Sequence, residues 1–252
     1  MSMSSPSSPQ SIISVHDVGL NFHKGRSSES LREKLLFRPK KVPAAQSFWA
    51  LRHVSFDVAP GEAIGVVGRN GSGKSTLLKL VAGVMLPDEG TIDVRDAVAP
   101  LIEITGGFVP ELTGRENLVL SAGLHGMTPR EIDEHFDEIV EFSGVGDFLD
   151  TPFRHYSSGM KVRLAFSVIS VLDAPILMVD EVLAVGDKAF REKCYARIRQ
   201  RLDSGTTLFL VSHSENDLKR FCTRALYLKN GVLAQDGPLN EVMQRYAADS
   251  ES

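Results

Sequence analysis

The chain has 252 residues, of which 42% are hydrophobic and 24% charged, and its net charge at pH 7 is -4. This length allows one large domain or two small ones, and the composition is that of an ordinary globular protein. The acidic balance disfavours a general nucleic-acid binder, which carries a basic surplus to neutralise phosphates, and no apolar run of about 18 residues is present to form a membrane-spanning helix.

The first part of the chain predicts a tail, a strand and an insert. Residues 1–11 are rich in Ser and Pro and lack the basic and apolar stretches of a signal peptide, so we expect a disordered tail. Residues 12–20 predict a strand. Residues 24–48 form an insert with a surplus of five basic side chains, which predicts either contact with anionic headgroups and diphosphate at a membrane surface or a solvated loop.

Two strands then lead into a glycine-rich loop. Residues 51–58 alternate as a strand with one exposed face, and residues 63–67 are a continuous apolar run, typical of a strand buried on both faces. The segment from Gly68 to Ser75 reads Gly-Arg-Asn-Gly-Ser-Gly-Lys-Ser, a complete P-loop pattern between a strand and a helix. The predicted ligands of ATP here are Gly68, Asn70, Gly71, Ser72, Gly73, Lys74, Ser75 and Thr76.

Each part of this loop has a chemical reason. Glycines let the backbone approach the phosphates, and free N–H groups at the start of a helix point towards the anion. Lys74 reaches the β- and γ-phosphates as a point charge, and the hydroxyl of Ser75 can bind Mg²⁺. The alternative is a glycine-rich loop that binds nothing, which the flanking strand and helix disfavour.

The middle of the chain, about residues 105–170, is more helical in pattern. Thr113 and Glu116 have the spacing of a capping box, and Thr128 and Pro129 predict the start of a second helix that Gly144 can end. Buried strands are predicted again at 176–179 and 207–211. A hairpin is predicted to turn at 230–231, and the last helix spans 239–248.

Two carboxylates follow the strand at 176–179. Asp180 and Glu181 would lie at the carboxyl edge of a parallel sheet, where ligands bind. Asp180 is the predicted ligand of Mg²⁺, and Glu181 is the predicted catalytic residue that polarises the attacking water. Alone this would be an ordinary charged strand end; the P-loop earlier in the chain makes the catalytic interpretation the stronger one.

With these motifs the chain resembles the ATP-binding cassette (ABC) family. Residues 156–160 stand where that family has its Leu-Ser-Gly-Gly-Gln signature, and Ser157 and Gly159 match it. Asp187 lies at the position of the D-loop aspartate, and His213 at that of the switch histidine, which makes it a catalytic candidate beside Glu181 and Lys74. The resemblance implies a homodimer in which Ser157, Gly159 and Asp187 of one subunit help to enclose ATP on the other.

The resemblance also implies an α/β fold: a P-loop cassette with a mostly parallel core sheet, an antiparallel β subdomain and a helical subdomain within residues 12–246, followed by a tail at 247–252. Two positions depart from the family pattern. The Q-loop glutamine is absent, so Glu103 or a neighbour is the expected replacement near Mg²⁺. The aromatic that stacks on adenine is either Phe22 or Trp49, with Trp49 favoured, and either could instead be a core residue.

Longer stretches, at 106–117, 156–166 and 180–187, are similar to one branch of the family, the ATPases of exporters for O-antigen, capsule, teichoic acid or galactan. That resemblance implies a polyprenyl-diphosphate-linked glycan as cargo, an integral-membrane permease present in two copies, and a peripheral location on the cytoplasmic face of the inner membrane. The alternatives are a transporter ATPase for another cargo, a soluble cassette ATPase working on ribosomes or DNA, a different P-loop enzyme such as a small-molecule kinase, and a non-catalytic interaction protein.

Overall fold

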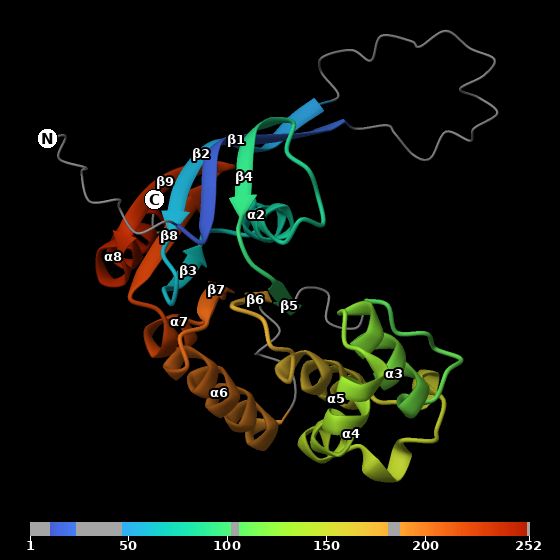
Figure 1. Cartoon of the computed structure of the whole chain (residues 1–252). Helices are drawn as coiled ribbons and strands as arrows, with labels where there is room; N and C mark the ends of the chain where they lie inside the picture. The colour runs from blue at the N-terminus through green and yellow to red at the C-terminus, as the bar shows by residue number, and fades with distance from the viewer. Residues whose placement is uncertain (1–10, 24–46, 102–105, 181–186, 251–252) are drawn as a thin grey trace, which may run out of the picture.

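Two β-sheets and a group of helices build the protein (Figure 1). The computed structural model describes residues 11–23, 47–101, 106–180 and 187–250. The antiparallel sheet has the order β2-β1-β4, formed by β1 (Ile13–His23), β2 (Ser47–Val58) and β4 (Glu89–Val94). The second sheet has the order β5-β6-β7-β3-β8-β9.

The second sheet is mostly parallel, as expected. Its strands are β3 (Ala63–Val67), β5 (Val98–Leu101), β6 (Ile176–Asp180), β7 (Thr207–Val211), β8 (Arg224–Lys229) and β9 (Val232–Pro238). All neighbours in it run parallel except β8 and β9, which form the predicted hairpin. Asn230 and Gly231 at its turn both have positive φ, 52° and 80°, as a two-residue hairpin turn requires.

Alternating side chains of the parallel strands pack on two different layers, because successive residues of a strand point to opposite faces. One face, which includes Val66, Met178 and Phe209, packs with the antiparallel sheet and with α2 (Lys74–Val81). The other face, which includes Val179 and Leu210, packs with α5, α6, α7 and α8. These helices span Ser158–Ser170, Lys188–Asp203, Glu215–Phe221 and Leu239–Ser250.

A third core holds the helical part together. It contains α3 (Gly114–Leu124), α4 (Pro129–Ser143), two 3₁₀ turns (Gly146–Phe148 and Phe153–His155) and the side chains of α5 that face them. In Figure 1 these helices lie on the side of the molecule away from the antiparallel sheet. The predicted capping box of Thr113 and Glu116 begins α3, a second one of Thr128 and Glu131 begins α4, and Gly144 ends α4 in a left-handed conformation.

The structure also extends several predicted elements. β1 continues to His23, and β2 begins at Ser47, because Phe22 pairs with Phe48 and His23 with Ser47. Ser47 and Phe48, expected to belong to the insert, are therefore part of a strand; residues 24–46 lie outside the described residues. The last helix runs to Ser250, two residues beyond its predicted end.

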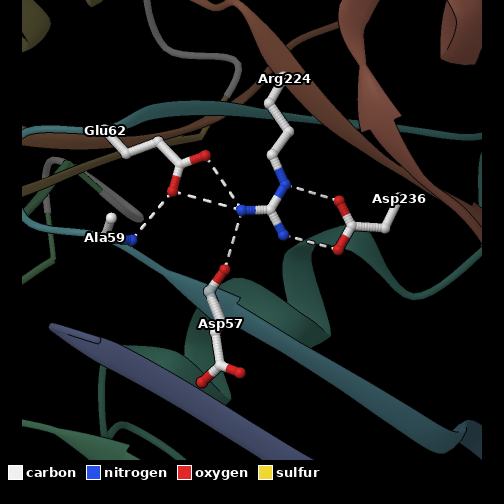
Figure 2. Close-up of polar contacts among 5 residues, drawn as sticks. All are labelled: Asp57, Ala59, Glu62, Arg224 and Asp236. Carbon is white, nitrogen blue, oxygen red and sulfur yellow. Dashed lines mark hydrogen bonds and ion pairs between the residues drawn. The ribbon is translucent and has the colours of Figure 1, made fainter. Parts of the chain in front are cut away.

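A polar cluster fastens the antiparallel sheet to the core sheet (Figure 2). Arg224 Nε and Nη2 each donate to one carboxylate oxygen of Asp236 at 2.6 Å, and Nη1 donates to the Asp57 carbonyl at 2.9 Å and to Glu62 at 3.0 Å. Glu62 in turn accepts the Ala59 N–H at 2.9 Å. The Asp236 and Glu62 carboxylates raise the pKa of Arg224 above its usual value despite partial burial. The end of β2, the turn before β3 and the β8–β9 hairpin are thereby held in one arrangement.

Within the described ranges, none of the helices has the length and apolar content needed to traverse a bilayer.

Candidate functional site

Three parallel strands bring the predicted chemical groups to the same sheet edge. In the register of the sheet, Val66 of β3 lies beside Val211 of β7, and Val211 lies beside Asp180 of β6. The P-loop starts two residues after Val66, and His213 lies two residues after Val211, so all three segments leave the sheet at one level. Ligands of parallel sheets bind at this carboxyl edge.

The P-loop leads into α2 without a side-chain cap. Among the described residues no side chain caps α2, and the first helical bond is made by the N–H of Leu77 to the carbonyl of Gly73. The N–H groups before Leu77 therefore have no partner within the helix, which is the arrangement that binds phosphate. Gly73 has φ 103°, and a Cβ there would lie 2.8 Å from the carbonyl oxygen of Ala50, so β2 passes too close for any side chain.

Lys74 is the first residue of α2, and its side chain folds back over the loop. Its Nζ donates to the carbonyl oxygens of Gly68 at 2.9 Å and Arg69 at 3.3 Å, and the residue is only 5% exposed. The ammonium group is thus held at the centre of the loop. A phosphate oxygen placed there would meet a positive charge already taken out of bulk water, where its attraction is stronger.

A cavity of about 630 Å³ opens beside this loop. Its lining comes from the ends of β1 and β2, the P-loop, the first turn of α2 and the β8–β9 turn. The lining residues are Phe22, Phe48, Trp49, Ala50, Asn70, Gly71, Gly73, Lys74, Ser75, Thr76, Asn230 and Gly231. The volume suits a ligand of nucleotide size, and the lining is aromatic at one end and rich in phosphate-binding groups at the other.

The aromatic end of the cavity holds three rings that differ in how far other side chains cover them. Phe22 and Phe48 are 37% and 52% exposed, and their ring centroids are 5.7 Å apart. Trp49 is more covered. The guanidinium of Arg52 lies 5.1 Å from its ring centroid, and a Cβ on Gly19 would come within 2.9 Å of the indole. All three rings line the cavity, so both aromatic candidates from the sequence, Phe22 and Trp49, lie where adenine could bind, and Phe48 joins them.

Phe48, Asn230 and Gly231 are members of the cavity that the sequence interpretation missed. Phe48 was assigned to the insert. Asn230 and Gly231 were recognised only as a hairpin turn, because nothing in their spacing connects them to a P-loop about 160 residues earlier. The signal available was local: a two-residue turn next to a buried strand has backbone groups to offer to a neighbouring loop.

Only some of the catalytic and metal-binding residues predicted beyond the P-loop lie within the described part of the chain. Asp180 is the last residue of β6 and is half-buried, and His213 is exposed directly before Ser214, the N-cap of α7. Glu181 and Glu103 lie outside the described residues.

Ser157, Gly159 and Asp187 lie on other elements. The Ser157 hydroxyl caps α5 by accepting the Met160 N–H at 3.2 Å, so this motif does begin a helix, as expected. Asp187 caps α6 by accepting the Phe190 N–H at 2.8 Å. α5 packs on α3, α4 and β5, whereas α2 packs on β2, β4, β6 and β7. Among the described residues that line the nucleotide-sized cavity, none comes from α5 or α6.

A family model and individual relatives agree on the family to which the chain is similar. A family model described as ABC transporter matches residues 51–184. The chain is 45% identical over 215 residues to the O-antigen export system ATP-binding protein RfbB of Klebsiella pneumoniae, which covers 84% of this chain and 87% of that protein. It is 42% identical over 212 residues to the teichoic acids export ATP-binding protein TagH of Bacillus anthracis, covering 84% of this chain and 38% of that protein.

Solved structures match in fold. An ATP-binding subunit of an ABC transporter superimposes with a TM-score of 0.72 at 23% identity, covering 94% of this chain and 93% of that one. A dimeric ATP-binding cassette in a post-hydrolysis state, bound to ADP and Pi, superimposes with a TM-score of 0.71 at 20% identity, covering 90% of this chain and 98% of that one.

Proposed function

The chain belongs to the ABC transporter family, whose cassettes bind and hydrolyse ATP, and from that membership we propose that it drives the export of a lipid-linked polysaccharide across the cytoplasmic membrane. The observation that carries this proposal is the 45% identity to an O-antigen export ATP-binding protein across 87% of its length. The similarity to a teichoic acid exporter supports polysaccharide export as the common property, since the two relatives are named for different polymers.

ATP binds in the cavity beside the P-loop. The β- and γ-phosphates lie against the N–H groups of the P-loop and the first turn of α2, and the Lys74 ammonium turns from the Gly68 carbonyl to the phosphates. Phe22 and Phe48 stack on the adenine ring because they are the more exposed aromatic side chains of the cavity. Trp49 supports this pair from a packed position beside Gly19 and Arg52.

Hydrolysis adds water to the γ-phosphorus and breaks its bond to the oxygen that bridges to the β-phosphate, giving ADP and phosphate. Glu181, one residue beyond β6, accepts a hydrogen bond from the attacking water and orients it. His213, at the end of the neighbouring strand, donates a hydrogen bond to the γ-phosphate. Mg²⁺ would be held by Ser75 and Asp180, with Glu103 near it, and would draw off the charge that develops on the β- and γ-phosphates.

A second copy of the chain completes each site. Ser157 and Gly159 at the start of α5 present backbone N–H groups and a hydroxyl to the γ-phosphate bound by the partner, and Asp187 at the start of α6 connects the two sites. Support for this assignment comes from the placement of these residues at helix starts, on elements separate from the P-loop cavity. Binding of two ATP molecules closes the dimer, and hydrolysis opens it.

The ATPase works at the cytoplasmic face of the inner membrane on a permease present in two copies, which carries the polyprenyl-diphosphate-linked glycan. The basic insert at 24–46 contacts anionic headgroups or the diphosphate of the cargo. Its surplus of positive charge in a chain of net charge -4 supports that role.

The test is made in the source organism by replacing the gene with Glu181→Gln and measuring lipid-linked glycan inside the cell. We expect a polyprenyl-linked polymer to accumulate, because the variant binds ATP and turns over poorly. Glu134→Gln, which changes an exposed acid on α4 that pairs with Arg130, is the matched control and should export normally. If ATPase activity is lost without accumulation, polysaccharide is not the cargo; if turnover is normal, Glu181 does not have its assigned role.

A further inference from the structure

Helix α6 connects two groups that have separate roles in the proposed ATPase cycle. Its N-cap is Asp187, and further along it packs against α7, the short helix that begins directly after His213 and Ser214. Tyr195 lies eight residues after Asp187, which is about 12 Å along a helix axis. Within the described part of the chain, the contact between α6 and α7 therefore links Asp187 to the segment that carries His213.

The centre of this contact is a buried hydrogen bond. The Tyr195 hydroxyl donates to Asp217 Oδ1 at 2.5 Å, and the two residues are only 8% and 7% exposed. Burial, with the Asp217 carboxylate beside it, raises the pKa of Tyr195 to about 12, so the hydroxyl keeps its proton and remains the donor. A short hydrogen bond to a buried carboxylate is stronger than an ordinary one.

Neighbouring side chains hold the tyrosine ring in place. The Arg220 guanidinium lies 4.3 Å from the ring centroid, and the Phe221 ring packs edge-on at 5.6 Å. Arg220 also forms an ion pair with Glu192 of α6 at 3.4 Å. These contacts leave the ring little freedom to turn, so α7 keeps one position on α6.

Asp217 transmits that position to the segment that carries His213. Its N–H donates to the Ser214 hydroxyl at 3.2 Å, which is the N-cap contact of α7. The Ser214 N–H donates to the Ser212 hydroxyl at 3.0 Å. His213 therefore lies between two serines whose hydrogen bonds fix the turn from β7 into α7, and Tyr195 reaches that turn through Asp217.

We propose that Tyr195 and Asp217 are positioning residues that set the placement of His213 against the γ-phosphate and couple it to Asp187 at the start of α6. This inference rests on the proposed ATPase function and on the role given to His213. When closure of the dimer moves Asp187, the rigid helix carries the motion to Tyr195, and the hydrogen bond carries it to the histidine segment.

A second tyrosine of the same chain gives the matched control. The Tyr227 hydroxyl donates to Asp249 Oδ2 at 3.1 Å, and Tyr227 is 1% exposed. This pair joins β8 to α8, and neither residue lines the nucleotide cavity or adjoins His213. Tyr227→Phe and Tyr195→Phe each remove one hydroxyl that a buried tyrosine donates to an aspartate, although Asp249 is partly exposed whereas Asp217 is buried.

The experiment measures ATP hydrolysis by the purified full-length chain. For Tyr195→Phe we expect kcat to fall about tenfold, less than the roughly hundredfold loss that a 1 Å misplacement can cause. KM for ATP should stay within about twofold, because the P-loop cavity is untouched. For Tyr227→Phe we expect kcat to stay within about twofold of wild type, and thermal melting should show both variants folded at the assay temperature.

A double-variant cycle with His213→Ala separates positioning from general loosening. If Tyr195 acts through the histidine, Tyr195→Phe should cause no further loss of kcat in the His213→Ala background. Equal kcat losses in Tyr195→Phe and Tyr227→Phe, or a Tyr195→Phe loss that multiplies that of His213→Ala, would overturn the positioning role while leaving the ATPase assignment intact. A His213→Ala variant with normal kcat would overturn the histidine's assigned role and this inference with it.

Discussion

Gly231 and Ser72, 159 positions apart in the chain, are joined by a hydrogen bond in which the Gly231 N–H donates to the Ser72 carbonyl at 3.1 Å. The Gly231 carbonyl accepts the N–H of Arg52 at 2.8 Å. One glycine of the β8–β9 turn thus holds the P-loop on one side and β2 on the other. The shape of the nucleotide cavity depends on this pair of backbone hydrogen bonds. The space around Gly231 is too small for a side chain.

Gly231→Ala should damage both stability and nucleotide binding. Gly231 has φ 80°, and a Cβ there would lie 2.6 Å from the Ala50 carbonyl oxygen, so β2 or the turn must shift. We expect a loss of about 2 kcal/mol in unfolding free energy and a raised KM for ATP. Thermal melting with and without ATP measures both effects. Gly237→Ala in β9 is the control, because a Cβ there has nothing within 4 Å; equal effects of the two substitutions would contradict the role of this pair of hydrogen bonds.

The phenylalanine pair predicts a loss of affinity without a loss of turnover. Phe48→Ala removes an exposed ring from the cavity and should raise KM for ATP about tenfold, since base–aromatic stacking contributes about 1–3 kcal/mol. Saturating kcat should be nearly unchanged. Trp49→Leu should instead lower the melting temperature, because the indole packs between Gly19 and Arg52. A large KM effect confined to Trp49→Leu would return the stacking role to the tryptophan.

The two cysteines should be unreactive in the folded chain. Cys194 and Cys222 are 4% and 5% exposed, and burial raises the pKa of each thiol to about 12. At pH 8 only about one thiol in ten thousand is then the reactive thiolate. A thiol-specific disulfide reagent should titrate no cysteine in native protein and both in denaturant. Rapid reaction of one native thiol would mean that α6 or the segment before β8 opens readily.

The ion pair between α4 and α6 should make stability depend on acid pH. Arg197 Nη2 donates to Glu138 Oε1 at 2.7 Å, and this bond lowers the pKa of Glu138 below its usual 4.5, against a smaller opposing effect of burial. A carboxylate with a lowered pKa stabilises the folded state above its unfolded pKa, and this contribution disappears as pH falls through the folded pKa.

Arg197→Met keeps the aliphatic stem that packs near Phe142 and removes the charge. Because Glu138 is 42% exposed, the loss should be below about 1 kcal/mol at pH 7 and smaller near pH 3. Urea unfolding at a series of pH values measures it. Arg130→Met, whose partner Glu134 is 53% exposed on the surface of α4, should change stability at neither pH. A constant difference across the series for Arg197→Met would point to lost packing instead of lost charge.

Local patterns predicted most of the elements in this fold because each has a local cause. The capping box at Thr113, the helix start at Thr128, the strand at 63–67 and the turn at 230–231 depend on neighbours within a few residues, and the structure confirms them. β4 was not predicted. Its residues are half or fully exposed, and Ile13 and Val15 of β1 provide the pairing that makes it a strand.

The candidate site was predicted in its motifs and missed in its surroundings. The P-loop and the strand-end groups form patterns that can be found by spacing, whereas the cavity is completed by Phe48 and the β8–β9 turn through long-range pairing. The contacts that distinguish the three rings of the cavity, Phe22 with Phe48 and Trp49 with Gly19 and Arg52, form only in three dimensions.

The strand order has a consequence for how the protein is made. Within the described sheet, β3 pairs only with β7 and β8, and β7 begins 140 residues after β3 ends. During synthesis the phosphate-binding loop therefore leaves the ribosome long before its supporting strands exist, and such distant pairings form late. A nascent chain interrupted before β8 would carry every residue of the P-loop but would lack the Gly231 N–H that donates to Ser72 and with it one wall of the nucleotide cavity.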